Sequence, residues 1–212
     1  YLAGLEAVNA YGERLAGQAL QQIPDGSYRF EDVMDDDGAG REAIPIRVTL
    51  RVAGGRVDVD FSGTAPQVEG NINCPLSVAA AGVYYVFRCL MPAHTPACAG
   101  SFRAISLTAP EGCLLNARRP AAVAAGNVET STRVVDVVMG ALAKALPDQI
   151  PAASHGSMNN LAMGYQGDEQ HTAWDYYETI GGGMGASESS DGLDGVQTHM
   201  TNTLNTPIES LE

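Results

Sequence analysis

Apolar residues recur at helical spacing in three stretches of the chain. The clearest is residues 129–146, where one face is filled at i, i+3, i+4, i+7, i+8 and i+11 by Val134, Val137, Val138, Ala141, Leu142 and Ala145. Residues 1–22 show the same periodicity, and residues 75–90 are rich in alanine, valine and aromatic residues, as in a helix buried on most sides. A proline follows each stretch, which predicts where the three helices end.

Polar and apolar residues alternate strictly in residues 47–52 and 56–61, which lie on either side of Gly54-Gly55. This is the strongest hairpin signal in the chain. Three shorter strands are predicted, at residues 105–108, 161–166 and 172–179. Because both kinds of element are present and no repeat is visible, the pattern predicts an α+β fold. We expect a mixed, mainly antiparallel sheet with two or three packed helices, in a single region over residues 1–212.

The composition is typical of a soluble globular protein. The chain of 212 residues has 45% apolar and 17% charged residues, which allows a full core. Its net charge is −13 and its 12 basic residues are scattered, which argues against nucleic acid or an anionic membrane surface as partner. No apolar run approaches the ~18 to 20 residues of a membrane span. Four cysteines without a C-x-x-C pair are expected to be buried free thiols in a reducing cytoplasm: Cys74, Cys89, Cys98 and Cys113.

The last third of the chain carries three polar, glycine-rich segments, residues 154–160, 178–186 and 191–203. They are dense in amide, hydroxyl, imidazole and carboxylate groups and contain no Lys or Arg. This composition suits a neutral polar pocket in which the backbone comes close to a ligand. Earlier in the chain, Asn127 or Thr130 can cap the third predicted helix, whose dipole favours the carboxylate of Glu129.

His155 is the imidazole best placed for chemistry. It is surrounded in sequence by hydroxyls and amides, those of Ser154, Ser157, Asn159 and Asn160. A histidine can pass a proton near neutral pH while amides hold a carbonyl or a carboxylate. The alternative is a polar network that only fixes the loop. Antiparallel pairing of the last two strands is expected to bring His155 and Asn160 close to Glu178 or Thr179.

Two other polar segments have simpler interpretations. Residues 181–185 (Gly-Gly-Gly-Met-Gly) lack the lysine of a phosphate-binding loop and follow Glu178, so we predict a tight polyglycine passage there. Oxygen and nitrogen ligands for a divalent cation occur at Asp191, Asp194, His199 and Asn202, but an Asx-type turn cluster explains them equally well. No histidine belongs to a spacing such as H-E-x-x-H, and we predict no metal site in this chain.

Several short motifs follow one another in a characteristic order. They are Ile-Pro-Asp-Gly at 23–26, Asp-Asp-Asp-Gly at 35–38, Asp-Phe-Ser-Gly-Thr-Ala at 60–65, Gly-Asn-Ile-Asn at 70–73, Gly-Asn-Val-Glu-Thr-Ser at 126–131, the three polar segments, and Asn-Thr-Pro-Ile-Glu at 205–209. Together they resemble the hydantoinase B/oxoprolinase family, the larger subunit of ATP-dependent enzymes that open cyclic amides. Members of that family are much longer, so we expect an internal to C-terminal fragment of such a subunit.

The resemblance implies a hydrolase acting on a hydantoin or 5-oxoproline, within a cytoplasmic hetero-oligomer. It implies that ATP is held by a separate A-type subunit, which phosphorylates the amide oxygen. The B-type subunit then supplies water and a divalent metal, held by Asp and His residues upstream of residue 1. By this resemblance the fragment binds no cofactor itself and is inactive alone. Its partners are the A-type subunit and a small cyclic amide, with no nucleic acid and no membrane.

On these grounds we expect His155 to be catalytic. The substrate-binding residues are expected to be Asn127, Glu129, Ser157, Asn159, Asn160, Glu178, Thr179, Gly182, Gly183, His199 and Asn202. Two alternatives stay open. The chain can belong to the alpha-type subunit of an acetone or acetophenone carboxylase, whose motifs overlap with these and which joins bicarbonate to a ketone. It can also be a non-catalytic assembly module whose glycine-rich loops pack against partner subunits.

Overall fold

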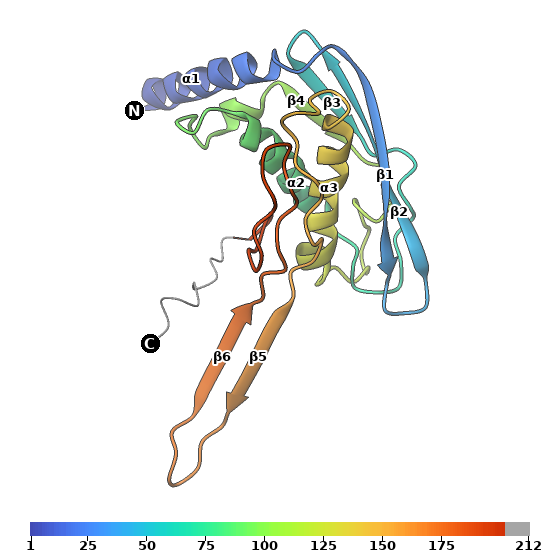
Figure 1. Ribbon diagram of the computed structural model, residues 1–212, viewed down its shortest axis with the longest axis vertical. Helices are drawn as coiled ribbons and strands as arrows, with labels where there is room; N and C mark the ends of the chain where they lie inside the picture. The colour runs from blue at the N-terminus through green and yellow to red at the C-terminus, as the bar shows by residue number, and fades with distance from the viewer. Residues whose placement is uncertain (202–212) are drawn as a thin grey trace.

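The computed structural model describes residues 1–201 (Figure 1). Its elements follow the chain in the order α1 (Leu2–Leu20), β1 (Gly26–Asp36), β2 (Glu42–Ala53), β3 (Arg56–Asp60), α2 (Leu76–Leu90), β4 (Ile105–Thr108), α3 (Ser131–Leu142), β5 (Asn160–Tyr165) and β6 (Trp174–Thr179). A 3₁₀ turn (Ala99–Phe102) precedes β4, and a π-helical turn (Gly126–Thr130) leads into α3. The predicted α+β class is confirmed.

The main sheet has the order β1-β2-β3-β4 and is antiparallel except for the parallel pair β3 and β4. The hairpin predicted around Gly54-Gly55 is confirmed, and these two residues have φ angles of 56° and 75°, which glycine adopts without strain. One face of β2 is buried through Ile44, Ile46, Val48, Leu50 and Val52. The other face carries Arg47, Thr49 and Arg51 toward solvent, so the alternation in the sequence reports the two faces correctly.

Strand β1 is absent from the prediction. It pairs along the whole of β2, from Gly26 opposite Val52 to Asp36 opposite Glu42. Five of its eleven residues are charged, and one of them, Asp32, lies on the side that faces α3. There Arg133 of α3 donates to the Asp32 carboxylate at 2.8 Å. This ion pair joins the main sheet to α3 at a position of β1 where a strictly alternating strand would carry an apolar residue. The alternation in the sequence therefore does not reveal β1.

Helix α3 packs against β1 and β2 on one side and against α2 on the other (Figure 1). Its core face is fully buried through Val134, Val135, Val137, Val138, Ala141 and Leu142. The helix is shorter than predicted at both ends, and the side-chain cap predicted for Thr130 is wrong. The Thr130 hydroxyl donates instead to the carbonyl of Ile72, while Asn127 offers its own carbonyl to the hydroxyl of Ser131. The first bond ties the π-helical turn to the loop that follows β3, and the second joins the turn to the start of α3.

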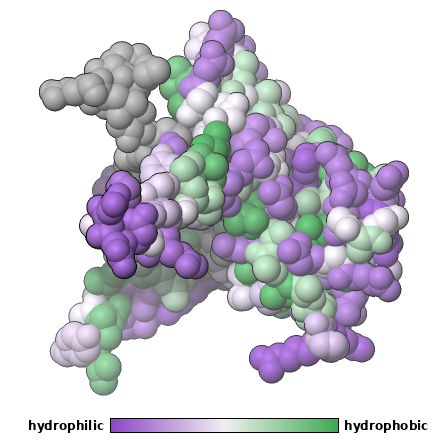
Figure 2. All heavy atoms as spheres, turned by 90° about the horizontal axis from the view of Figure 1, so that it is seen from below, coloured by the Kyte–Doolittle hydropathy of each residue, from purple (hydrophilic) through white to green (hydrophobic). Residues whose placement is uncertain are grey.

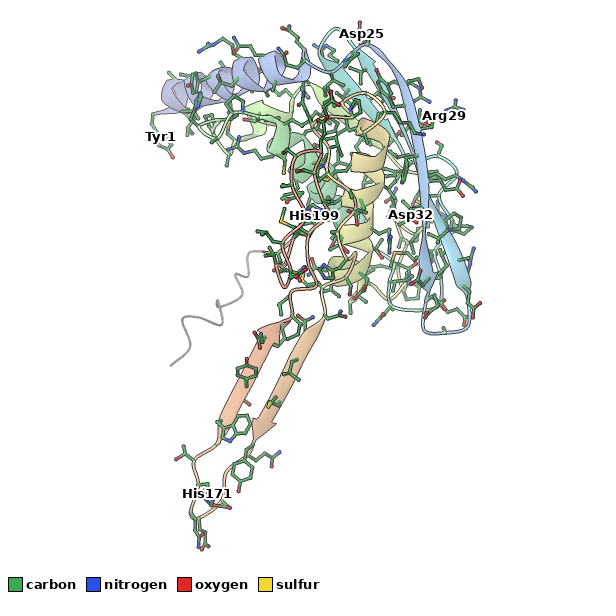
Figure 3. All side chains as sticks on the ribbon, in the orientation of Figure 1. Tyr1, Asp25, Arg29, Asp32, His171 and His199 are labelled. Atoms are coloured by element: carbon green, nitrogen blue, oxygen red, sulfur yellow. The ribbon has the colours of Figure 1, made fainter. Side chains whose placement is uncertain are left out.

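Strands β5 and β6 form a separate two-stranded sheet that projects from the rest of the molecule (Figure 1). Their predicted pairing is confirmed, with Asn160 opposite Thr179. Every residue of β5 is exposed. Figure 2 views the molecule from this end and shows hydrophobic residues interspersed among hydrophilic ones. His171 lies at the tip of the hairpin, exposed to solvent as expected for a turn residue (Figure 3).

The tip of this hairpin is expected to open in acid. Asp168 accepts hydrogen bonds from the Tyr165 hydroxyl and from the backbone N–H groups of Gln170 and His171, which lower its pKa to about 2. A carboxylate with a lowered folded pKa stabilises the fold above its unfolded pKa of about 4, and this contribution is lost as the pH falls through the folded value. We therefore expect the fluorescence of Trp174, the only tryptophan, to change between about pH 4 and about pH 2. Asp168→Asn should abolish that change, and a variant that keeps it would contradict the assignment.

All four cysteines are free thiols, but the expectation that all four are buried is wrong. Cys74 and Cys113 are buried in the core, and burial raises the pKa of Cys74 to about 12. Cys89 is exposed near the end of α2, and Cys98 is half-buried in the turn before the 3₁₀ turn. In residues 1–201, no helix combines the length and apolar character that crossing a membrane requires.

Candidate active site

A cavity of about 500 Å³ opens where the loop after β1 meets the π-helical turn and residues 155–159. Its carboxylates come from Asp35, Asp36, Asp37 and Glu129. Asn71, Arg133, His155, Ser157 and Asn159 complete its polar wall. We call it the acidic cavity. It brings together four of the residues predicted for the site, Glu129, His155, Ser157 and Asn159, from segments almost thirty positions apart in the sequence.

The imidazole of His155 is held firmly in the wall of the acidic cavity. Its Nδ1 lies 3.3 Å from the carbonyl oxygen of Gly183. A Cβ atom at Gly182 would lie 2.3 Å from Cγ of the ring, so only glycine lets the backbone pass this close. Nε2 is buried and has no hydrogen-bond partner within residues 1–201. With Nδ1–H donating to the carbonyl, Nε2 carries the lone pair that can accept a proton.

Asp136 fixes the loop that carries His155. This aspartate is 5% exposed and projects from the otherwise valine-lined part of α3. It accepts hydrogen bonds from the backbone N–H of Ser154 at 3.2 Å and from the Ser154 hydroxyl at 3.0 Å. The Thr132 hydroxyl donates to the carbonyl of Gly156 at 3.0 Å. One turn of α3 therefore holds the residues on both sides of His155.

Ser157 links the loop to the π-helical turn. Its hydroxyl lies 2.9 Å from Oε1 of Glu129 and 3.1 Å from Oδ1 of Asn159. Asn160 lies beyond these residues and accepts a hydrogen bond from the Thr179 hydroxyl at 3.0 Å, as expected from the strand pairing. His155 itself contacts Gly182 and Gly183 in the segment after β6, whereas the strand pairing predicts a contact with Glu178 or Thr179.

The loop after β1 is anchored by Asp37, which directly follows Asp35 and Asp36 at the end of that strand. Asp37 is buried and accepts backbone N–H groups from Ala39 at 2.8 Å, Arg41 at 2.9 Å and Gly70 at 3.2 Å. The hydrogen bonds from Arg41 and then Ala39 lower the pKa of this carboxyl group most. Asp37 therefore stays ionised and shapes the loop, which leaves Asp35 and Asp36 exposed at the cavity mouth.

A second cavity, of about 540 Å³, lies on the other side of the same two segments. It is lined by Ala81, Tyr85, Asn127, Met158, Tyr177, Thr179, Met200 and Thr201. We call it the neutral cavity, because none of these side chains is charged. His199 stands beside it, with Nδ1 3.1 Å from the Tyr85 hydroxyl and Nε2 3.7 Å from Oδ1 of Asp136.

The residues predicted for one site are thus divided between two cavities. Asn127 and Thr179 line the neutral cavity and His199 adjoins it. Gly182 and Gly183 support His155, which confirms the tight polyglycine passage. Glu178 lines neither cavity and accepts a hydrogen bond from Tyr176 on the hairpin. Asn202 and the motif at 205–209 lie outside the described residues.

Sequence reasoning missed several residues that shape the site. The sequence shows Asp35, Asp36 and Asp37 only as a motif, and it places Tyr85 and Asp136 within helices without a role. Asp136 gives the clearest overlooked signal, because it falls among four valines on a helix whose neighbours are all buried. A charged residue at such a position must have buried partners, and here these are Ser154 and His199.

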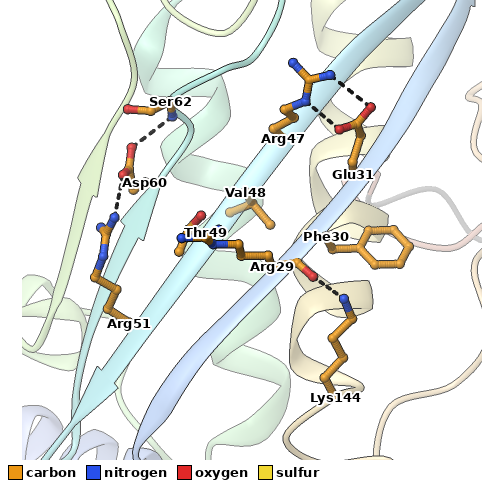
Figure 4. A pocket seen from close by; sticks show the side chains of 10 residues that line it. All are labelled: Arg29, Phe30, Glu31, Arg47, Val48, Thr49, Arg51, Asp60, Ser62 and Lys144. Carbon is orange, nitrogen blue, oxygen red and sulfur yellow. Dashed lines mark hydrogen bonds and ion pairs between the residues drawn. The ribbon is translucent and has the colours of Figure 1, made fainter.

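A third cavity, of about 690 Å³, lies on the outer face of the main sheet (Figure 4). Its charges are paired across the strands: Arg47 with Glu31, and Arg51 with Asp60 at 3.0 Å. Lys144 donates to the carbonyl of Arg29. No predicted site residue lines this cavity, and cross-strand pairs of this kind are ordinary features of a solvated sheet face.

The acidic cavity does not form a metal-binding set from this chain alone. Among residues 1–201, no three side chains of His, Cys, Asp or Glu come together as ligands for an ion. Of the candidate ligands Asp191, Asp194, His199 and Asn202, the first three lie in the described residues and form no such group, since His199 contacts Tyr85 and Asp136. The described residues therefore do not fit the metal that the resemblance implies.

Sequence comparison agrees with the motifs and with this geometry. The whole chain, residues 1–212, matches the family described as hydantoinase B/oxoprolinase. The chain belongs to this family. Its relatives include 5-oxoprolinase 1 of Arabidopsis thaliana, which is 41% identical over 98% of this chain and 16% of the relative. The B-type subunit of a putative D-/L-hydantoinase from Pseudomonas sp. is 32% identical over 99% of this chain and 37% of the relative.

Two solved structures share the hydantoinase B fold of this chain. An ATP-dependent caprolactamase from Pseudomonas jessenii superposes with a TM-score of 0.70 over 89% of this chain and 33% of its own, at 24% identity. An acetone carboxylase in a nucleotide-free structure gives a TM-score of 0.70 over 92% of this chain and 28% of its own, at 14% identity. The chain thus spans well under half of each relative and each structure.

Proposed function

We propose that this chain forms the acid–base part of a B-type subunit in an ATP-dependent enzyme that opens cyclic amides such as hydantoins or 5-oxoproline. The observation that carries the proposal is that His155 lines the acidic cavity and that its buried Nε2 has no hydrogen-bond partner within residues 1–201. The names of the relatives, a 5-oxoprolinase and a hydantoinase of the B type, support the substrate class.

An unstrained five-membered amide is a poor acceptor of water, so the reaction needs electrophilic activation of the amide. We assign ATP and that activation to an A-type partner subunit. The glycine segment 181–185 supports this division of labour, because it is packed against His155 and the carbonyl of Ala152 and leaves no phosphate cradle there.

His155 would then act on water. Nε2 accepts a proton from the water whose oxygen forms the new bond to the phosphorylated amide carbon, and it returns a proton to the nitrogen as the carbon–nitrogen bond breaks. This leaves an acyl phosphate, from which a second water releases phosphate and the ring-opened acid. Glu129 and Ser157, joined at 2.9 Å, orient the polar groups around that water. The role of this chain is thus to place one proton acceptor, Nε2 of His155, beside the intact ring of the cyclic amide.

The chain alone is expected to have neither ATPase nor amidohydrolase activity, since the proposal places nucleotide chemistry on the partner. The test incubates it with ATP, magnesium ions, 5-oxoproline and hydantoin, and follows phosphate release and ring opening. The longer polypeptide that contains this chain is then assayed together with its A-type subunit, where ring opening should depend on ATP. Turnover by the chain alone would contradict the division of labour. If the complex consumes ATP only with acetone and bicarbonate, the carboxylase function would replace the hydrolase function proposed here.

The same proposal includes an oligomer of A-type and B-type subunits in the cytoplasm. The Pseudomonas relative is named as one subunit of a hydantoinase, which supports a partner subunit for this chain. The two buried, unpaired thiols of Cys74 and Cys113 are compatible with a reducing compartment. Copurification of both subunits from cell extract at a fixed ratio would test this assembly.

A further inference from the structure

The neutral cavity is the feature that the proposed function leaves unused. It shares its walls with the acidic cavity, because the π-helical turn and residues 157–159 send alternate residues to the two sides. The acidic side receives Glu129, Ser157 and Asn159, whereas the neutral side receives Asn127 and Met158. Two adjoining cavities of about 500 and 540 Å³ therefore differ sharply in charge.

The lining of the neutral cavity defines the chemistry of what it can hold. Met158, Met200 and Ala81 offer apolar contacts, and Asn127 offers an amide. A polar atom of a ligand can pair with Asn127 or with the hydroxyl of Tyr85, but a carboxylate or phosphate would meet no cation among the described lining residues. The cavity is therefore suited to a small, uncharged molecule with one or two polar atoms.

Tyr85 is held in place by a chain of buried partners. Its hydroxyl lies 3.1 Å from Nδ1 of His199, whose Nε2 lies 3.7 Å from Oδ1 of Asp136. Burial, and then the neighbouring Cys89 thiol, raise the pKa of Tyr85 to about 12, so the phenol keeps its proton. Burial also lowers the pKa of His199, against the opposing effect of Asp136. The lowered pKa keeps the His199 ring neutral, and its single N–H belongs on Nε2, which faces Asp136. Nδ1 then accepts the proton of the Tyr85 hydroxyl, and the phenol oxygen keeps a lone pair for a donor group of a ligand.

The backbone beside this chain of partners is strained. His199 and Met200 have φ angles of 60° and 43°, in the left-handed region that side chains other than glycine rarely adopt. The turn brings the His199 ring against Tyr85, with ring centroids 5.5 Å apart, and puts Met200 into the cavity wall. Strain of this kind is retained where the surroundings require one arrangement, and it is concentrated at ligand sites.

We propose that the neutral cavity is a second binding site, which takes an uncharged cyclic amide of the lactam or hydantoin type and accepts a hydrogen bond from its ring N–H at the Tyr85 oxygen. Asn127 supplies the complementary amide contact, and the methionines cover the ring. His199 and Asp136 are positioning residues for Tyr85. The site discriminates by charge, and it therefore disfavours 5-oxoproline, which carries a carboxylate. The choice of a cyclic amide as the ligand rests on the proposed function, whereas binding at Tyr85 does not depend on the reaction at His155.

Calorimetric titration of the full-length polypeptide without ATP tests the site. The probes are 2-pyrrolidinone and 5-oxoproline, which share one ring and differ by the carboxylate. We expect saturable binding of 2-pyrrolidinone, with 5-oxoproline weaker by about 10-fold or more at this site. Tyr85→Phe should raise the Kd for 2-pyrrolidinone about 10-fold, since it removes one neutral hydrogen bond and keeps the aromatic ring.

Tyr84→Phe is the matched control, because Tyr84 precedes Tyr85 on α2 but stacks on Phe102, with ring centroids 4.7 Å apart. It should leave the Kd unchanged, and denaturation midpoints of both variants confirm that they are folded. The proposal is overturned if 2-pyrrolidinone shows no saturable binding, if Tyr85→Phe binds it as the wild type does, or if 5-oxoproline binds equally well. These results are independent of turnover. If the complex opens no ring but Tyr85→Phe still weakens 2-pyrrolidinone binding, the proposed function is wrong and this binding site remains supported.

Discussion

The His155→Ala complex is expected to lose about 10²-fold to 10⁴-fold in kcat while its denaturation midpoint stays close to that of the wild type. The reason is that Nε2 has no hydrogen-bond partner in residues 1–201, so the fold gains little from it. Nδ1 contributes one hydrogen bond, to Gly183 at 3.3 Å. A proton acceptor, by contrast, has no substitute in the loop once the imidazole is gone.

A purely structural role for His155 predicts a different result. If His155 only braces the loop, its loss should appear as about 1 to 3 kcal/mol of unfolding free energy, with activity per folded molecule unchanged. His94→Ala is the control, because His94 is exposed and lies outside all three cavities. A destabilised but fully active His155→Ala variant would remove His155 from the site.

Replacing Asp136 with alanine is expected to lower the free energy of unfolding by about 3 kcal/mol, because two partly buried groups of Ser154 lose their acceptor at about 1 to 3 kcal/mol each. Those groups are the backbone N–H at 3.2 Å and the hydroxyl at 3.0 Å. The contact between Oδ1 of Asp136 and Nε2 of His199, at 3.7 Å, is lost as well. Urea unfolding of the chain, followed by circular dichroism, measures the difference.

Asp136→Asn is the matched variant, since it keeps an acceptor oxygen for Ser154 and removes only the charge. We expect Asp136→Asn to lower the free energy of unfolding by about 1 kcal/mol, so that its stability lies between those of the wild type and Asp136→Ala. If Asp136→Ala does not fold at all, Asp136→Asn still shows whether loss of the charge makes the chain less stable than the wild type. An alanine variant as stable as the wild type would show that Asp136 does not hold the loop.

The elements with strong local patterns were predictable from the sequence, and those set by distant partners were not. The hairpin of β2 and β3 is encoded by alternation around two glycines, so its register follows from residues within one short stretch. Strand β1 carries Asp32 toward α3, and its assignment depends on Arg133, about a hundred positions later. No local pattern contains that information.

The site shows the same limit. The polar segment 154–160 is recognisable from composition, and His155 does line a cavity. The division into an acidic and a neutral cavity was not predictable, because it depends on which residues of two facing segments point to which side. Tyr85 is hidden in an apolar helix, and only the fold brings its hydroxyl to His199.

The most direct measurement of the central claim follows the oxygen of water into the product. The complete complex is incubated with ATP and a cyclic amide in ¹⁸O-labelled water, and the products are analysed by mass spectrometry. The account predicts a ring-opened acid that contains oxygen from water, formed only with ATP and reduced in proportion to kcat in His155→Ala. A ring left closed under these conditions, while acetone and bicarbonate are joined in an ATP-dependent reaction, would contradict it.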